Sequence, residues 1–323
     1  MTRSVSLFVV ASFIQACCWS VERLPRAGES VAATAMASET GGKGFNLAVA
    51  ARRLGAPVSV IIALGEDAAA EAALQVLQQH AIAPIYAYRL SPQSGHGAGL
   101  IGADGANMVS VYLGPNRLLT AAHVANAAAS IQAATLVYAQ FETSLAAIES
   151  AFAFARQAGR QTVLNPSPWQ VIPPALLAQT SMLILNQSEA AQLLAWPAEL
   201  VAQSPEITIN ALQQAISRFY QTWSGELLVV TLGAWGSVAM TQAGEWIISP
   251  AFAVVAVDTL GAGDAFAAAL CVALARGDAL PQALQFANAC GAIVAQQPGV
   301  LGALPDAAQV STFMRQRQAT LPV

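Results

Sequence analysis

The sequence carries little charge, and its positive charge comes almost entirely from one residue type. Asp, Glu, Lys and Arg make up 10% of the 323 residues, and the formal net charge is −4. Lys43 is the only lysine, so the other Lys or Arg positions are all arginines. No basic cluster occurs, which argues against nucleic acid as the main partner. No stretch of about 18 residues beyond the N-terminus is free of charges and helix breakers, so we expect no transmembrane helix.

Cysteine is scarce as well. The four cysteines are Cys17, Cys18, Cys271 and Cys290, and their spacing matches no paired metal-ligand motif. We expect buried thiols of a reducing compartment rather than disulfides or a zinc centre.

Apolar runs are abundant, because 55% of the residues are hydrophobic. Runs typical of β-strands alternate with helical runs, which predicts a parallel sheet wrapped by helices. The length allows one large α/β domain or two modest ones. The predicted strands are Leu7–Ser12, Val58–Leu64, Thr135–Phe141, Gln161–Leu164, Met182–Leu185 and Leu227–Thr231. The predicted helices are Ala68–His80, Leu145–Ala158, Ser188–Ala195 and Asn210–Trp223.

Two regions break this alternation. Residues from about 17 to 39 and from about 95 to 113 have the composition of extended segments with turns and little helix. Within the second region, Gly102-Ala103-Asp104-Gly105 predicts a hairpin turn between two strands.

The most informative stretch is 258–264, with the sequence DTLGAGD. A predicted strand, Ala251–Val257, leads into it, and an apolar helix is predicted to begin at Asp264 or the next residue. Gly261 and Gly263 allow a tight turn whose N–H groups converge, and the helix dipole adds positive potential, which predicts an anion site. A carboxylate beside bound phosphate is unfavourable, because like charges repel, so a functional role would explain its presence. Asp264 would have such a role if it took a proton from a hydroxyl while the turn stabilised a phosphoryl group in transfer.

A second glycine-rich motif, GGKGFN at 41–46, follows an extended run and precedes a predicted helix, Leu47–Leu54. Together, and in this order, the two motifs resemble the paired signatures of the ribokinase-like (PfkB-type) carbohydrate kinases, and the pattern is nearest to ribokinase. The resemblance extends over nearly the whole chain.

This resemblance implies a fold and an activity. The fold would be a single ribokinase-like α/β domain over residues 1–323, with a central, mostly parallel sheet flanked by helices. Segments 17–39 and 95–113 would form a small β-sheet lid over the sugar. The activity would be ATP-dependent phosphorylation of a hydroxymethyl group on a sugar or sugar-like molecule.

The resemblance also assigns the catalytic and substrate residues. Asp264 would be the general base, and the backbone N–H groups of Gly261, Ala262 and Gly263 would form the anion hole. The sugar-binding residues would be Gly42, Lys43, Asn46 and Glu142. A lone lysine inside a glycine turn suggests a function, although a solvated loop lysine is the alternative. Glu142 is also compatible with an exposed carboxylate at a helix start.

The nucleotide and cation residues come from the same resemblance. ATP would be bound near Asn186, Thr231, Gly233, Gly236 and Asn288. Glu189 would hold Mg²⁺, mostly through water, and backbone groups near Asp258, Leu260 and Gly299 would hold K⁺. An ordinary helix capping box would explain Asn186 and Glu189 equally well, and a plain turn would explain the two glycines.

One departure from the family pattern concerns the sugar. Ribokinases carry an Asn and an Asp just after the first strand that hold sugar hydroxyls, and here Ile14 and Ala16 stand in their places. Loss of these polar partners argues against D-ribose. The alternatives are a nucleoside or keto-deoxy sugar acid kinase of the same family, or a catalytically silent metabolite-binding protein. An oxidoreductase is disfavoured, because Phe266 stands where a dinucleotide fingerprint expects a third small residue.

The N-terminus has two interpretations. Val5 to Cys18 imitates a short signal peptide, whereas the family resemblance favours a buried first strand and a cytoplasmic enzyme. The expected partner is a small sugar-like substrate, with neither nucleic acid nor membrane, and the lid would offer a surface for a homodimer.

Overall fold

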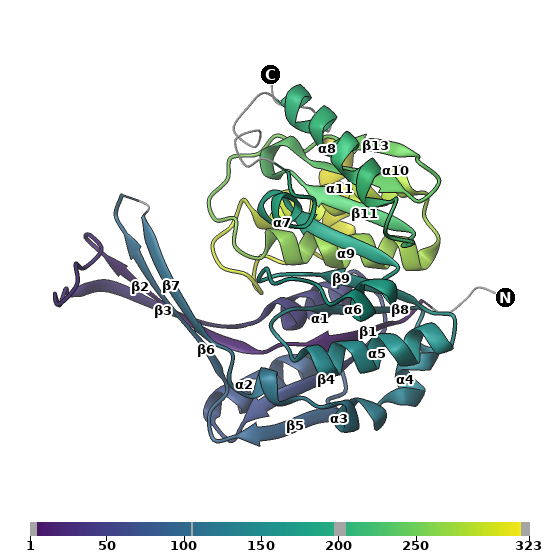
Figure 1. Ribbon diagram of the computed structural model, residues 1–323. Helices are drawn as coiled ribbons and strands as arrows, with labels where there is room; N and C mark the ends of the chain where they lie inside the picture. Colours follow the sequence, from purple (N-terminus) through teal and green to yellow (C-terminus); the bar gives the residue numbers. More distant parts are fainter. Residues whose placement is uncertain (1–4, 105, 197–204, 318–323) are drawn as a thin grey trace.

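The computed structural model describes residues 5–104, 106–196 and 205–317, and within them the chain forms two sheets (Figure 1). The large sheet has nine strands among the described residues. Their order is β13 (Trp246–Ser249), β12 (Ser237–Thr241), β11 (Leu227–Thr231), β10 (Met182–Asn186), β9 (Gln161–Asn165), β8 (Leu136–Gln140), β1 (Leu7–Ala11), β4 (Val58–Gly65) and β5 (Tyr86–Ser91). In this order, all neighbouring strands from β11 through β10, β9, β8, β1 and β4 to β5 are parallel, and only the β11–β12 and β12–β13 pairs are antiparallel. The predicted α/β class is confirmed.

The first strand explains why this sheet is buried on both faces. Leu7, Val9 and Ala11 enter one core, and Phe8 and Val10 enter the other, so every β1 side chain is apolar and buried. Such strands require helices on both faces. One face carries α1 (Lys43–Arg53), α2 (Ala68–Gln79), α9 (Ala262–Arg276), α10 (Leu280–Val294) and α11 (Ala307–Gln316). The other carries α3 (Ala121–Ala125), α4 (Ala128–Ala133), α5 (Leu145–Gln157), α6 (Pro174–Ala178), α7 (Gln187–Leu193) and α8 (Pro205–Phe219).

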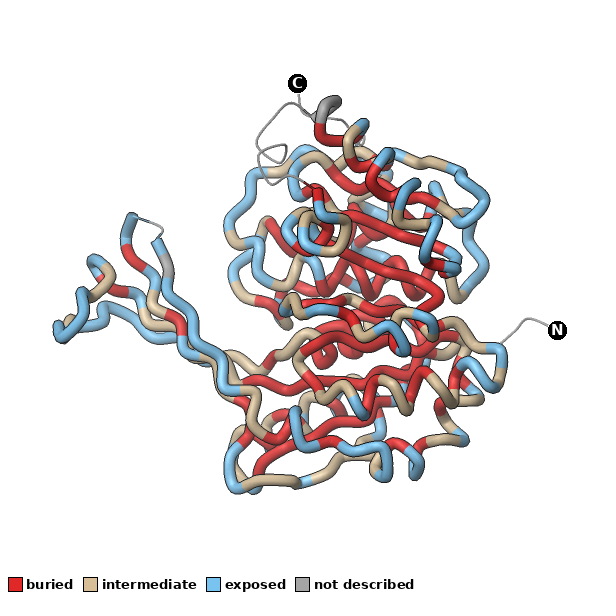
Figure 2. The backbone as a smooth tube through the Cα atoms, viewed as in Figure 1, coloured by how far each residue is buried: buried red, intermediate tan, exposed pale blue. Residues whose placement is uncertain are grey.

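The second sheet, called the small sheet here, projects from the body (Figure 1). Its order is β3 (Ala33–Gly41), β2 (Ile14–Val21), β6 (Gly95–Gly102) and β7 (Asn107–Tyr112). Much of its length is exposed (Figure 2). It begins earlier than predicted, at Ile14, so the two positions that depart from the family pattern lie inside it. The β6–β7 pair is antiparallel, as a hairpin requires, although Gly105 of the predicted turn lies outside the described residues.

Several element boundaries differ from the sequence prediction, three of them near the site. Ala251–Val257 forms no strand and has only one bridge residue, Phe252, because β13 has already ended at the edge of the sheet. In this segment Phe252 is buried while Val255 and Val257 are exposed, so the apolar run divides between core and solvent. Helices α1 and α9 both begin earlier than predicted, at Lys43 and Ala262, which brings the glycine motifs into their first turns. No helix of the described ranges is long and apolar enough to span a membrane.

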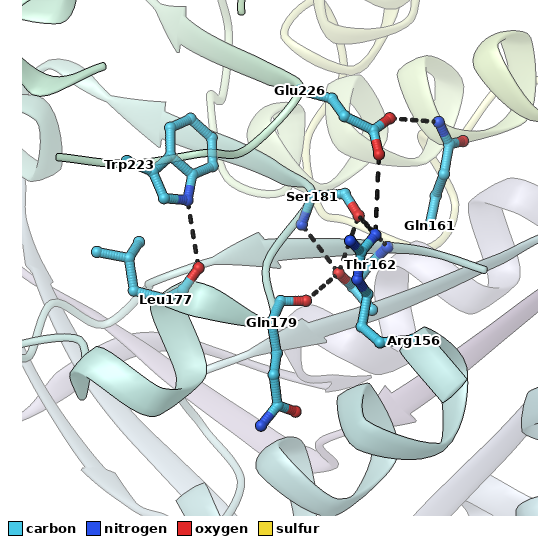
Figure 3. Close-up of polar contacts among 8 residues, drawn as sticks. All are labelled: Arg156, Gln161, Thr162, Leu177, Gln179, Ser181, Trp223 and Glu226. Carbon is cyan, nitrogen blue, oxygen red and sulfur yellow. Dashed lines mark hydrogen bonds and ion pairs between the residues drawn. The ribbon is translucent and has the colours of Figure 1, made fainter. Parts of the chain in front are cut away.

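Polar contacts stabilise the large sheet at the amino ends of β9, β10 and β11 (Figure 3). The buried Thr162 hydroxyl donates to the Gln179 carbonyl over 2.5 Å and accepts from the Ser181 N–H over 2.9 Å. Arg156 donates to the Ser181 hydroxyl over 2.8 Å, and the Trp223 indole donates to a carbonyl of α6 over 3.2 Å. This end of a parallel sheet lies opposite the end that usually binds ligands.

Candidate active site

The candidate site lies at the carboxyl ends of the central parallel strands, where α1 and α9 begin. Ser12 follows β1 and Glu142 follows β8, while Asn186 and Thr231 end β10 and β11. These strands are close in the sheet order, so residues from distant parts of the sequence come to one edge. Open α/β sheets bind their ligands at this edge.

The first motif forms the start of α1. Gly42 is the N-cap with φ of +111°, and a Cβ there would lie 2.7 Å from the Ser12 carbonyl oxygen, so only glycine fits. Lys43 and Asn46 therefore lie in the first helical turn. The Glu142 carboxylate accepts from the Lys43 N–H over 2.9 Å and from the Ser12 hydroxyl over 2.6 Å. Glu142 thus stabilises the amino end of α1, a favourable place for negative charge.

The second motif forms the start of α9. Gly261 is the N-cap with φ of +76°. The Ala262 N–H donates to the Thr259 carbonyl over 3.2 Å. Within the described ranges, no hydrogen bond engages the N–H groups of Gly261, Gly263 or Asp264. Free N–H groups at the start of a long helix form a cradle for an anion.

Asp264 and Asn46 join the two helix starts. The Asn46 amide donates to Asp264 Oδ2 over 2.8 Å, and both side chains are buried. The Asn46 Oδ1 atom is buried without a hydrogen-bond partner among the described residues. A buried acceptor of this kind is costly unless a donor reaches it. A hydroxyl group of a bound ligand would supply that donor.

Charges at the site shift one another's pKa. Burial raises the pKa of Asp264, and the Lys43 ammonium and the Asn46 hydrogen bond oppose this rise only in part. Burial also raises the pKa of Glu142, against the opposing effects of Lys43 and the Ser12 hydrogen bond. For Lys43, burial lowers the pKa, but the carboxylates of Asp264, Glu142 and Glu189 raise it more, so the net change is upward. Lys43 is therefore a cation facing three carboxylates, none of which is within the 4.0 Å ion-pair distance among the described residues.

Two cavities meet at this site. The smaller one, about 70 Å³, is lined by Lys43, Asp264 and Glu189 among others. The larger one, about 1100 Å³, has mostly apolar walls that include Phe252 and Phe266. The two share Asn186, Thr231 and Gly263 in their linings. Gly233, Gly236 and Asn288 line the larger cavity, as the resemblance requires for nucleotide residues.

Asn186, Glu189 and Asn288, which were predicted to bind nucleotide or metal, also form hydrogen bonds within the protein. Asn186 caps α7, and Glu189 completes a capping box, so the capping box that the sequence allowed is present. The Glu189 oxygens accept from the Asn186 side chain over 2.8 Å and the Asn165 side chain over 3.3 Å. The Asn288 amide donates to the Ser249 carbonyl over 2.9 Å and so anchors the end of β13 beside the larger cavity. A capping role does not exclude ligand contact, because Asn186 and Glu189 both line the smaller cavity.

The segments predicted for a monovalent cation lie against one another. The Asp258 carboxylate accepts from the Leu260 N–H over 2.9 Å and from the Gly299 N–H over 3.2 Å. The turn before α9 is thereby tied to the loop after α10. Within the described chain, no group of three or more His, Cys, Asp or Glu side chains gathers to hold a metal ion.

At the two positions where the family pattern has an Asn and an Asp, the small sheet carries the uncharged side chains of Ile14 and Ala16. Ile14 is opposite Gly41 in β3 and Gly95 in β6, and Ala16 is opposite Glu39 and Gly97. Ile14 is buried at the junction of the small sheet and the body. Beside the Lys43 motif, the small sheet therefore presents an isoleucine, an alanine and glycines, with the Glu39 carboxylate next to Ala16.

Asn165 and Ser167 are cavity residues that the sequence analysis did not identify. Asn165 ends β9 and Ser167 follows it, and both line the smaller cavity together with Lys43 and Asp264. The signal was present, because polar residues in the motif NPSP at 165–168 follow a predicted buried strand. A parallel sheet presents such residues at its ligand-binding edge.

Comparison with known proteins agrees with this geometry. The model of the pfkB family carbohydrate kinases matches residues 6–307. The Bacillus subtilis ribokinase is 30% identical over 293 residues, covering 91% of this chain and 94% of its own. A Salmonella typhi deoxyribokinase is 28% identical over 246 residues, covering 76% and 77%. The Arabidopsis thaliana ribokinase structure, solved with ribose and ATP, has a TM-score of 0.87 and 26% identity, covering 96% of this chain and 98% of its own.

The chain belongs to the pfkB family of carbohydrate kinases. It is a ribokinase-like sugar kinase, a phosphotransferase that acts on a hydroxyl acceptor.

Proposed function

We propose that the protein transfers the γ-phosphoryl group of ATP to a hydroxymethyl group of a sugar that lacks part of the hydroxyl pattern of D-ribose. The observation that carries this proposal is the Asn46–Asp264 pair, which joins the starts of α1 and α9. The pair places a buried carboxylate beside free helix N–H groups, next to the junction of the two cavities.

In this reaction Asp264 accepts the proton of the sugar hydroxyl as that oxygen attacks phosphorus. The raised pKa of Asp264 suits a base better than an ordinary aspartate, because proton transfer is most efficient when the pKa approaches the working pH. The N–H groups of Gly261 and Gly263 stabilise the charge of the transferring group. Lys43, which lines the smaller cavity together with Asp264, adds a positive charge there.

The larger cavity is the proposed ATP site. Its apolar walls suit adenine, and its shared edge with the smaller cavity directs the phosphates towards Asp264. ATP is also bound by the related Arabidopsis ribokinase. Mg²⁺ fits the donor set through water, because Asn186 and Asn165 already orient the Glu189 carboxylate at the cavity wall. When bound, the metal would neutralise phosphate charge.

The small sheet is the proposed lid, and it sets sugar selectivity. The side chains of Ile14 and Ala16 cannot form hydrogen bonds, so the lid favours a sugar with fewer hydroxyl groups near these two positions. The deoxyribokinase relative supports a deoxy sugar in particular. The unpartnered Asn46 Oδ1 would accept from a remaining hydroxyl. A homodimer through the small sheet and K⁺ binding between the Asp258 turn and the Gly299 loop complete the proposal.

The sugar selectivity is tested by restoring the polar side chains of the family pattern at positions 14 and 16. We expect wild type to favour 2-deoxy-D-ribose over D-ribose, measured as kcat/KM from ADP release. In the double variant Ile14→Asn/Ala16→Asp, the ratio should move towards D-ribose by at least about tenfold. Trp19→Phe, a change in the same strand, is the control and should leave the ratio unchanged. A ratio that is equal in wild type and the double variant would show that these positions do not read the sugar.

A further inference from the structure

A carboxylate of the small sheet reaches the body of the protein close to the anion cradle. Glu39 is in β3, opposite Ala16 in β2, and Ala16 is opposite Gly97 in β6. Residues directly opposite each other in a sheet share a face, so Glu39 has only small neighbours across these strands. Its Oε2 atom accepts from the Val300 N–H over 3.1 Å, across 261 residues of sequence. The resemblance to the family assigned no role to Glu39.

The loop after α10 is shaped to receive this carboxylate. A Cβ on Gly299 would lie 2.3 Å from Glu39 Oε1, so any side chain at 299 would displace Glu39. The N–H group of Gly299 itself donates to the Asp258 carboxylate over 3.2 Å. The loop is therefore held on one side by the small sheet and on the other by the turn that precedes α9.

Val300 continues this contact to the cradle. Its side chain is buried, and a Cβ on Gly261 would lie 2.4 Å from Val300 Cγ1. The Val300 methyl group thus fills the space beside Gly261, which has no side chain to fix its own position. A contiguous path runs from Glu39 through the Val300 backbone and side chain to Gly261.

We propose that Glu39 is a positioning residue for phosphoryl transfer: it holds the small sheet on the 299–300 loop and, through Val300, fixes Gly261 and the N–H cradle of α9. An anion hole acts only when its donors are held in place before charge develops. The catalytic consequence rests on the proposed function, whereas the structural path does not. Glu39 touches no reacting atom in this account.

The structural path is tested by amide hydrogen exchange in the full protein without ligands. Three amides report it: Val300, which donates to Glu39, and Ala262 and Ala265, whose hydrogen bonds hold the Gly261 turn. In Glu39→Ala all three should exchange at least about tenfold faster, because the acceptor is lost and the loop loosens. Glu39→Gln keeps an acceptor oxygen and should stay within about threefold of wild type.

Glu22→Gln is the matched control, because Glu22 is an exposed carboxylate just beyond the far end of strand β2 of the small sheet. It should leave exchange at all three amides unchanged. Faster exchange at Val300 alone would overturn the link to the cradle, and unchanged exchange at Val300 would overturn the contact itself. Both results are independent of any substrate.

The catalytic consequence is tested with a double-mutant cycle. Glu39→Ala should lower kcat about tenfold with the KM for ATP within twofold, and Glu39→Gln should restore kcat to within about threefold of wild type. In a Val300→Ala background, Glu39→Ala should lower kcat less than twofold, because the link to Gly261 is already cut. A full tenfold loss in that background would refute the path through Val300. If wild type phosphorylates no sugar, the proposed function fails, and the exchange experiment alone then decides the positioning claim.

Discussion

Replacement of the buried carboxylate at the centre of the site separates its chemical role from its structural one. Asp264→Asn is nearly isosteric. In wild type the Asn46 amide lies 2.8 Å from Asp264 Oδ2, and the amide oxygen of the new asparagine can accept the same hydrogen bond. The variant loses the ability to accept a proton. General base catalysis contributes about 10²–10⁴-fold, so we expect kcat to fall by that factor, equivalent to about 3–5 kcal/mol of barrier. The KM for the sugar should change only a few fold.

The same variant should not be less stable than wild type at neutral pH. Because burial raises the pKa of Asp264, its ionised form is disfavoured in the folded state relative to the unfolded state. This destabilisation is absent below the unfolded-state pKa, grows as pH rises, and is complete above the folded-state pKa, at about 1.4 kcal/mol per unit of pKa difference. Asp264→Asn removes it, so its Tm should equal or exceed that of wild type at pH 7, and this gain should vanish near pH 3.

The assay is sugar-dependent ADP release alongside thermal unfolding of both proteins. Asp278→Asn, at an exposed carboxylate just beyond α9, is the control and should retain wild-type kcat and Tm. A kcat for Asp264→Asn within tenfold of wild type would refute the base assignment. A large drop in its Tm would instead show that the carboxylate is needed for folding.

Three further predictions concern charge, backbone and scaffold. Lys43→Met removes the cation that lowers the pKa of Asp264, so the acidic limb of the kcat/KM profile should move to higher pH. Lys43→Arg keeps the positive charge and should leave the acidic limb where it is in wild type. Identical acidic limbs in the two variants would contradict this role of Lys43. Gly261→Ala should lower kcat about 100-fold, because the new Cβ would lie 2.4 Å from Val300 Cγ1. Gly277, at the other end of α9, has a similar positive φ, but a Cβ there would meet no atom within 4 Å. Gly277→Ala is therefore the control and should keep the wild-type kcat. Thr162→Val removes a buried hydroxyl with several partners (Figure 3) and should lower the free energy of unfolding by about 1–3 kcal/mol without changing kcat, measured by urea titration.

The sequence was sufficient to predict the fold class, and its two glycine motifs point to residues that the structure brings together. Buried parallel strands appear as short apolar runs, and β1 is one of them. The two glycine motifs predict helix starts with unusual backbone geometry, and Gly42 and Gly261 have positive φ angles at the starts of α1 and α9. Asn46 and Asp264 were assigned separately to sugar and base, and the structure joins them by a hydrogen bond.

Other features depend on tertiary context that one sequence does not contain. The run Ala251–Val257 has strand composition, yet it lies beyond the last strand and wraps the larger cavity instead. The contact of Glu39 with Val300 depends on how the small sheet meets the body across 261 residues, which no local pattern encodes. Ser167 has the local sequence of an ordinary loop serine, and only the folded chain brings it to the wall of the smaller cavity with Lys43.

The central claim is that this chain phosphorylates a sugar through Asp264. The most direct measurement is mass-spectrometric detection of the phosphorylated product with ATP and Mg²⁺ across pentoses, deoxypentoses, hexoses, keto-deoxy sugar acids and nucleosides. The account predicts phosphate ester on one class, strongest for a deoxy sugar, and none with Asp264→Asn. ATP binding without phosphate transfer to any of these compounds would contradict it.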